Sequence, residues 1–186
     1  MSPKWQASDL FRGSQRKEPP KEDLFDIDLE HGTLKRKIDG TRVAAMGSIG
    51  WATIEKELRG TFISGAAVIL QRMGYSYGTY LGRHAKSQGQ TPEETFESLQ
   101  NFARDSGWGE MVLSSGDLSS GQARIVVKGC FFCVHIRDSA EPVCNMLVGL
   151  VGGVADEMIG QTPRVQEERC VAKGDAVCEI LVERLS

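Results

Sequence analysis

The sequence predicts an α+β fold, in which an antiparallel sheet packs against about four helices. Three observations lead to this class. Segments with the apolar spacing of a helix fill the middle of the chain, and runs of alternating apolar and polar residues stand before and after them. A total of 186 residues is ample for one core and marginal for two. We therefore expect a single domain over residues 23–186, preceded by a flexible arm over residues 1–22.

The first element after the arm is a predicted β-hairpin over residues 23–40. The arm itself is polar and ends in RKEPPKED, with a proline pair and no apolar period. The next segment, LFDIDLEHGTLKRKIDG, alternates apolar and polar residues around His31-Gly32. Its strands are expected at residues 24–29 and 34–38.

Helical periodicity begins at Thr41, and it predicts four helices along the chain. The third has the strongest local signal, because Thr91 is a suitable N-cap and Glu94 completes a capping box behind Pro92. In the second, glycines recur every four residues, so one stripe is bare and another backbone or a flat ligand can approach it. The expected helices cover residues 41–58, 60–87, 91–107 and 141–160.

The remaining apolar runs predict the sheet. EMVLSS and ARIVVKGCFFCVHI are expected to be strands joined by the loop GDLSSG, and RVQEERCV and AVCEILVE complete the sheet near the C-terminus. The core of helices and strands should therefore occupy residues 41–136, ahead of a cysteine-rich subdomain over residues 137–186.

Composition bounds the function. The apolar content of 40%, the charged content of 25% and the net charge of −3 are ordinary for a globular protein and give no broad attraction for nucleic acid. The N-terminus lacks a signal-peptide pattern, and no run reaches the roughly 18 apolar residues that span a bilayer. We expect a cytoplasmic protein with reduced thiols, whose five cysteines are metal ligands, reactive thiols or small core residues rather than a disulfide framework.

Three of these cysteines can meet at one point. Cys144 falls in the first turn of the last helix, and a hairpin turned around Gly174-Asp175 brings Cys170 and Cys178 opposite each other. Glu167 can reach the same point if a bulge redirects its strand. Three thiolates and a carboxylate would form a closed tetrahedral site that suits structural zinc. The alternative, that these cysteines are buried core residues, has nearly equal weight on spacing alone.

The Cys-x-x-Cys pair Cys130 and Cys133 is interpreted differently. It lies in a predicted strand, where positions three apart point to opposite faces, so core packing is expected for both thiols. No nucleophile-histidine-carboxylate grouping, Walker loop or dinucleotide fingerprint is found in the sequence, and no enzymatic activity is expected.

EPVCNMLVGLVGGVADEMIG followed by VQEERCVAKGDAVCEILVE resembles the C-terminal half of the 4-vinyl-reductase-type domain, a small-molecule-binding domain. HGTLKRKIDGTRVAAM and LQRMGYSYGTYLG are similar to the hairpin and glycine helix of the sensor domains in phenol- and xylene-responsive transcription activators. The resemblance covers about residues 22–186. It implies a structural zinc at Cys144, Glu167, Cys170 and Cys178.

The same resemblance implies a homodimer with an enclosed apolar pocket, and a fold similar to that of the vesicle-tethering TRAPP subunits. The phenol sensors carry a pocket tryptophan near the position of Lys128, so phenol is not the expected ligand. The activators continue into further domains, whereas this sequence stops at Ser186, so we expect a downstream regulatory protein to receive any signal. The expected ligand-binding residues are Tyr77, Phe102, Trp108, Lys128 and Phe132.

The sequence thus predicts a stand-alone, zinc-stabilised sensor or carrier of an aromatic, hydrocarbon or lipid-like molecule. Two alternatives stay open: a tetrapyrrole-binding or reductase-related factor of pigment metabolism, and a TRAPP-like interaction subunit.

Overall fold

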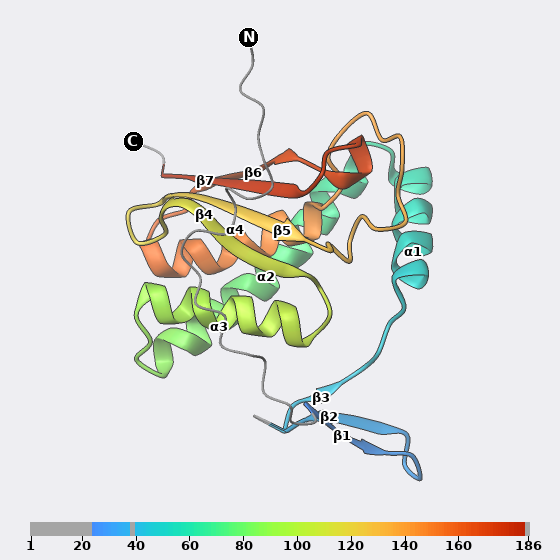
Figure 1. Cartoon of the computed structure of the whole chain (residues 1–186), viewed down its shortest axis with the longest axis horizontal. Helices are drawn as coiled ribbons and strands as arrows, with labels where there is room; N and C mark the ends of the chain where they lie inside the picture. The colour runs from blue at the N-terminus through green and yellow to red at the C-terminus, as the bar shows by residue number, and fades with distance from the viewer. Residues whose placement is uncertain (1–23, 38–39, 185–186) are drawn as a thin grey trace. The chain divides into compact units, whose positions relative to one another are not determined.

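The structure is a computed structural model, and it describes residues 24–37 and 40–184. The predicted N-terminal arm lies outside the described residues. The chain divides after Ala45 into an N-terminal unit, Met1–Ala45, and a larger unit, Met46–Ser186. Each unit is described by itself below (Figure 1).

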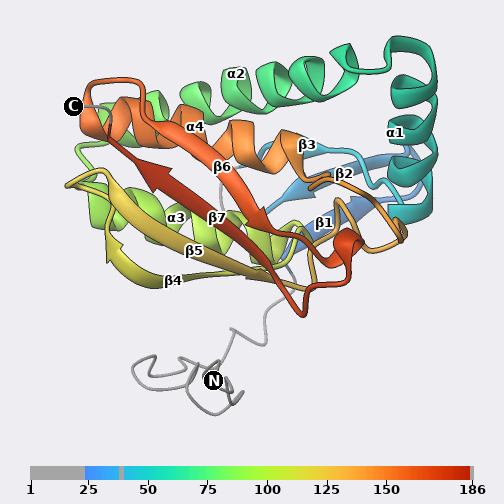
Figure 2. The same ribbon diagram turned by 90° about the horizontal axis from the view of Figure 1, so that it is seen from above.

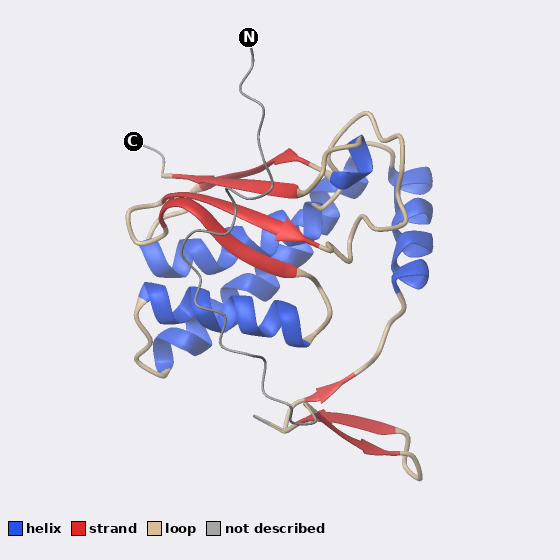
Figure 3. Ribbon diagram, viewed as in Figure 1, coloured by secondary structure: helices blue, strands red, loops and turns tan. Residues whose placement is uncertain are grey.

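The N-terminal unit contains the predicted hairpin. Strand β1 (Phe25–Asp28) pairs antiparallel with β2 (Thr33–Arg36), and a short strand β3 (Arg42–Val43) adds to the free side of β2 (Figure 3). The turn is held by Asp28, which accepts hydrogen bonds from the backbone N–H of His31 at 3.0 Å and pairs with its ring at 2.8 Å. Because β3 continues the sheet, the helix predicted from residue 41 starts only at Ser48.

The larger unit contains four α-helices in its described residues: α1 (Ser48–Phe62), α2 (Gly65–Ser87), α3 (Pro92–Asp105) and α4 (Asn145–Ile159). The first break falls at Ile63, which has a φ of 45°, whereas the sequence placed it beside Gly60. The capping box of α3 is confirmed, because Thr91 Oγ1 accepts from the N–H of Glu94 at 3.2 Å and the Glu94 carboxylate accepts from the N–H of Thr91 at 2.8 Å.

The sheet of the larger unit is antiparallel in the order β4-β5-β7-β6. Helices α2, α3 and α4 lie on one face of it (Figure 2). Side chains on β7 alternate, so that Cys178, Ile180 and Val182 are buried under α4. The strands are β4 (Glu110–Asp117), β5 (Gln122–Lys128), β6 (Arg164–Arg169) and β7 (Cys178–Glu183).

The strand predicted over residues 123–136 is half as long as expected. Strand β5 ends at Lys128, and Gly129 follows it with a φ of +60°, a conformation that glycine adopts readily and that stops the extended chain. Residues 131–135 then form turns. The second half of the predicted strand is therefore a compact turn at the end of the sheet.

The bare glycine stripe of α2 is filled by the backbone of α4. A Cβ atom added to Gly74 would lie 1.9 Å from the carbonyl oxygen of Met146, and one added to Gly78 would lie 2.1 Å from that of Leu150. The fit is mutual, because a Cβ on Gly149 would lie 2.0 Å from the carbonyl oxygen of Gln71. Of the two occupants that the sequence left open, another backbone and a flat ligand, the stripe takes the backbone.

In the part of the chain that the structure describes, every helix is too short or too polar to cross a membrane.

Candidate functional site: a buried cluster of five cysteines and one glutamate

The four metal ligands predicted from the sequence come together at one end of the sheet. The thiols of Cys144, Cys170 and Cys178 and a carboxylate oxygen of Glu167 all lie within 4.8 Å of one another. The Cys144 sulfur lies 3.7 Å from that of Cys178 and 3.9 Å from that of Cys170. All three cysteines are fully buried.

Each of these residues stands at the end or at an irregularity of an element. Cys144 is the N-cap of α4, Cys170 follows the last residue of β6, and Cys178 is the first residue of β7. A short 3-10 helix, Val171–Lys173, and Gly174 in the left-handed conformation turn the chain between the two strands. This connection is longer than the tight turn expected from the sequence, but it places the two thiols as predicted.

Glu167 reaches the cluster because its strand is irregular. The pairing of β6 with β7 shifts register between Glu167 and Arg169, which is the kind of bulge that the sequence argument required. One carboxylate oxygen of Glu167 accepts a hydrogen bond from the backbone N–H of Cys144 at 2.9 Å. The other, Oε1, is buried without a hydrogen-bond partner among the described residues.

The electrostatics of Glu167 reflect this burial. Desolvation, followed by the charge of the neighbouring Cys170, raises the pKa of Glu167 to about 8. A buried polar atom without a partner is rare in proteins. Its position beside three thiols is the observation that tests the site for a cation, and the residues fit, because a cation would satisfy the orphaned oxygen and the thiolates together.

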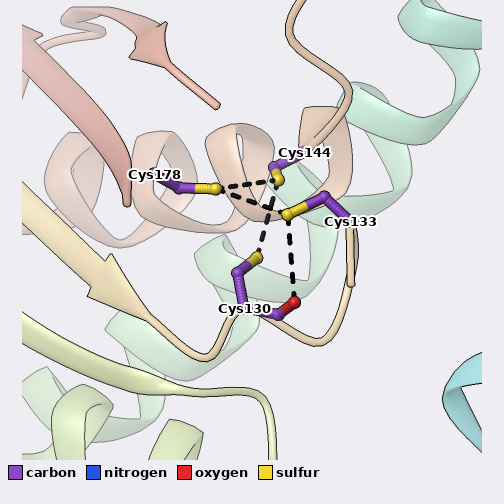
Figure 4. Close-up of side chains that lie close together, drawn as sticks. All are labelled: Cys130, Cys133, Cys144 and Cys178. Carbon is purple, nitrogen blue, oxygen red and sulfur yellow. Dashed lines mark hydrogen bonds between the residues drawn. The ribbon is translucent and has the colours of Figure 1, made fainter. Parts of the chain in front are cut away.

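Sequence reasoning missed two members of the cluster. Cys130 and Cys133 were expected to point to opposite faces of a strand, but the turn after β5 directs both sulfurs inward (Figure 4). Cys130 lies 3.5 Å from the sulfur of Cys144, and Cys133 lies 3.4 Å from that of Cys178. The missed signal was Gly129, since a glycine directly before Cys-x-x-Cys allows the strand to end there and form a turn.

Cys130 and Cys133 form a second possible ligand set with Cys144 and Cys178, and these four sulfurs again lie within 4.8 Å of one another. Thiolates bound to one tetrahedral zinc at about 2.3 Å are about 3.8 Å apart. The sulfur separations of 3.4 to 3.9 Å in the cluster match that spacing. The buried cysteine cluster therefore has the geometry to hold a metal ion.

Backbone amides next to the cluster are directed at its ligands or their neighbours. The N–H of Val171 donates to the sulfur of Cys178 at 3.5 Å, and the N–H of Cys170 donates to the carboxylate of Asp175 at 2.8 Å. Donors of this kind favour the thiolate form of a ligand and fix the loop that carries it. The connection between β6 and β7 is thus preorganised around the cluster.

A buried ion pair on α1 supports the same region. Glu55 is 1% exposed, and its carboxylate accepts hydrogen bonds from the indole N–H of Trp51 at 3.1 Å and from Arg59 at 2.6 Å. Arg59 also donates to the carbonyl oxygen of Val143 at 3.3 Å, directly before the ligand Cys144. Helix α1 is thereby linked to the start of α4. Burial raises the pKa of Glu55, although Arg59 opposes that shift.

Replacing Arg59 by methionine should destabilise the protein more at pH 8 than at pH 5. Glu55 has a raised folded-state pKa, so the stability from its protonated form is fully present below the unfolded-state pKa and is lost as pH rises through the folded-state pKa. Without Arg59 the buried carboxylate loses its charged partner, and we expect a loss of about 1–3 kcal/mol at pH 8. Urea denaturation at both pH values measures it.

The control for that experiment is the double variant Glu55→Gln/Arg59→Met, which has no titrating group at position 55. Its difference from Glu55→Gln should be the same at both pH values. A loss for Arg59→Met that does not depend on pH would contradict the assigned role of Glu55.

Four of the five predicted ligand-binding residues form one row of aromatic rings. Tyr77 on α2 contacts Phe102 on α3 and Trp108 in the following loop, with ring centroids 6.0 and 6.3 Å apart. Trp108 also contacts Phe102 at 5.1 Å and Phe132 at 5.2 Å. The row begins near the surface, where Tyr77 stacks on the exposed Tyr80, and ends at Phe132, which is 2% exposed.

The aromatic row therefore runs from the surface of α2 to the turn that carries Cys130 and Cys133. Sequence reasoning missed its last member, Trp51, whose ring lies edge-on to Phe132 at 5.3 Å. The fifth predicted residue, Lys128, lies at the end of β5 with its ammonium group 3.4 Å from the carboxylate of Glu110. Its role toward a ligand stays a prediction.

Known proteins share this sequence and fold in part. Residues 123–184 match the 4-vinyl-reductase-type domain family. The uncharacterized protein MJ0150 of Methanocaldococcus jannaschii is 23% identical over 109 residues, which are 59% of this chain and 62% of that protein. The phenol regulator MopR of Acinetobacter guillouiae is 41% identical over 56 residues, which are 28% of this chain and 10% of MopR. The chain thus spans less than two thirds of either relative.

Two solved structures share the fold. The phenol-responsive sensory domain of the transcription activator PoxR, solved with phenol, has a TM-score of 0.70 at 19% identity, over 87% of this chain and 85% of that one. Subunit 3 of the trafficking protein particle complex from Naegleria fowleri, covalently bound to palmitic acid, has a TM-score of 0.57 at 15% identity, over 75% of this chain and 93% of that one.

The fold likeness agrees with the local sequence match. All six residues of the cysteine cluster lie within residues 123–184, and the sensory-domain fold extends over most of the chain. Residues 123–184, with the cysteine cluster at their centre, are therefore a 4-vinyl-reductase-type domain.

Proposed function

We propose that this chain is a sensor or carrier domain that binds a hydrophobic small molecule and is stabilised by zinc. The observation that carries the proposal is the aromatic row, which connects the surface of α2 with the buried turn beside the cysteine cluster. Aromatic side chains commonly line sites for apolar ligands, because they offer a large contact area at a low cost in conformational entropy.

In this proposal zinc has a structural role. Cys144, Glu167, Cys170 and Cys178 would hold it, and four protein ligands leave no open position for a substrate. The metal would connect the start of α4 to both strands of the C-terminal hairpin. We accordingly propose that the chain has no enzymatic activity of its own.

The ligand class follows from chemistry that two neighbours in fold share. PoxR was solved with phenol and the Naegleria subunit with palmitic acid, and both molecules are largely apolar. We propose an aromatic, hydrocarbon or lipid-like ligand in contact with Tyr77, Phe102, Trp108 and Phe132. We propose Lys128 as a polar contact at the edge of the site.

We also propose that the chain acts as a homodimer and passes its signal to another protein. The hairpin of the N-terminal unit supports this, because Ile27 and Leu29 are 67% and 88% exposed. Exposed apolar side chains of this size often mark a surface that another chain covers.

The direct test is binding of a hydrophobic panel by the full chain. Phenol, an alkylated phenol, palmitic acid and protoporphyrin IX would be titrated in thermal melts, and native mass spectrometry would report any retained ligand and the oligomeric state. At least one compound should raise the melting temperature in a concentration-dependent way. Phe102→Leu should weaken that binding by about fivefold or more, because the ring contact is lost.

The matched control is Phe62→Leu, the same substitution on a phenylalanine that is 51% exposed at the end of α1. It should bind as the wild type does. A panel in which no compound binds would overturn the proposed function. Binding of porphyrin alone would instead favour the tetrapyrrole alternative, and a stable protein partner with unchanged function in Phe102→Leu would favour the interaction subunit.

A further inference from the structure

The cysteine cluster contains more donors than one tetrahedral ion can use. Five thiols and the carboxylate of Glu167 converge, and they divide into two sets of four. The first set is Cys130, Cys133, Cys144 and Cys178, and the second is Cys144, Glu167, Cys170 and Cys178. The sets share Cys144 and Cys178. A single ion in either set would leave two donors of the other without a metal.

The shared pair has the spacing of two bridging ligands. The sulfurs of Cys144 and Cys178 lie 3.7 Å apart, close to the edge of about 3.8 Å expected for a tetrahedron of thiolates around zinc. Two tetrahedra that share one edge need six ligands in total, two bridging and four terminal. The cluster supplies that number in that division.

The terminal donors lie close to the shared edge. Cys130 is 3.5 Å from the Cys144 sulfur, Cys133 is 3.4 Å from the Cys178 sulfur, and Cys170 is 3.9 Å from the Cys144 sulfur. The fourth terminal donor is the orphaned oxygen of Glu167. We propose that the cluster binds two zinc ions bridged by the thiolates of Cys144 and Cys178, with Cys130 and Cys133 completing one ion and Glu167 and Cys170 the other.

Charge and donor type agree with this assignment. Five thiolates and one carboxylate carry more negative charge than two divalent ions carry positive charge, so the repulsion between neighbouring ions is offset. Sulfur-rich tetrahedral sets favour zinc over magnesium or calcium, which prefer oxygen ligands. The second ion would anchor the turn after β5, and therefore the Phe132 end of the aromatic row, to the start of α4.

The proposal deepens the zinc site of the proposed function and rests on it. Its test is the zinc content of the reduced full chain, measured by elemental analysis and by the mass of the folded protein in native mass spectrometry. Wild type should hold two zinc ions per chain. Cys130→Ser/Cys133→Ser should hold one, and so should Glu167→Gln/Cys170→Ser, because each double variant removes the terminal ligands of one ion.

The matched control is Val134→Ser, which introduces a hydroxyl in the same turn at a residue that is 38% exposed, and which should keep both ions. Cobalt supplies a second measurement that needs no variant. Two cobalt ions bridged by thiolates should show a magnetic moment below that of two independent ions, and coupling of this kind requires shared ligands.

The outcomes separate this proposal from the one on which it rests. One zinc in wild type, retained by Cys130→Ser/Cys133→Ser, would overturn the second ion and leave the proposed structural zinc in place. No zinc in wild type would overturn both metal assignments. Two cobalt ions without magnetic coupling would overturn the bridged arrangement. Ligand binding is measured separately in the thermal titration.

Discussion

Replacing Gly149 by alanine is expected to destabilise the protein by about 3 kcal/mol or more, although alanine is the better helix former. The new Cβ would lie 2.0 Å from the carbonyl oxygen of Gln71 and 2.8 Å from the backbone nitrogen of Tyr75. Both atoms belong to the backbone of α2, so no side chain can rotate away. Helices α2 and α4 would have to separate, and the apolar contacts between them would be lost.

Gly152→Ala is the matched control for this substitution. It lies in the same helix, and its nearest neighbour would be a methyl group of Val165 at 3.6 Å, an ordinary contact. Higher helix propensity should leave this variant as stable as wild type or stabilise it by up to about 1 kcal/mol. Denaturant unfolding at fixed zinc concentration measures both changes. Equal stability of the two variants would show that the helices do not pack this closely.

Removing the metal ligand Cys178 is expected to have the second large effect. Cys178 belongs to both ligand sets, so Cys178→Ser should reduce zinc content more than Cys130→Ser or Cys170→Ser. Structural zinc contributes on the order of 10 kcal/mol to folding in small domains. A fall in melting temperature of more than about 10 °C is therefore expected for Cys178→Ser.

Chelation provides the matching measurement on the wild-type chain. A strong zinc chelator should lower the melting temperature of wild type toward that of Cys178→Ser, and it should change the variant much less. Unchanged zinc content and stability in Cys178→Ser would mean that the cluster is only buried core and that the metal assignment is wrong.

The ligand set around Cys144 could be predicted because its signals are local. A cysteine at the start of a glycine-rich helix and two cysteines flanking a Gly-Asp turn fix the backbone positions of three thiols. The position of Glu167 was predictable in outline, since only a bulge separated it from the same point. The structure contains that bulge, as a register shift beside Glu167 in the pairing of β6 with β7.

The Cys130 and Cys133 thiols could not be placed in the same way. Apolar residues on both sides of this pair resemble a continuous strand, and in a strand the two thiols diverge. The left-handed conformation of Gly129 ends β5 earlier and turns both sulfurs inward. Sequence periodicity does not distinguish a glycine inside a strand from one that ends it, because the choice depends on what the next residues can pack against.

The sequence by itself determined the fold class, the capped helix α3, the C-terminal hairpin and the convergence of Cys144, Glu167, Cys170 and Cys178. Each of these follows from local chemistry: apolar periodicity, capping residues and turn glycines. Only the tertiary structure decided that the glycine stripe of α2 receives the backbone of α4, and that five thiols rather than three meet at its N-terminus. Both outcomes depend on contacts between segments far apart in the sequence, and no local pattern specifies them.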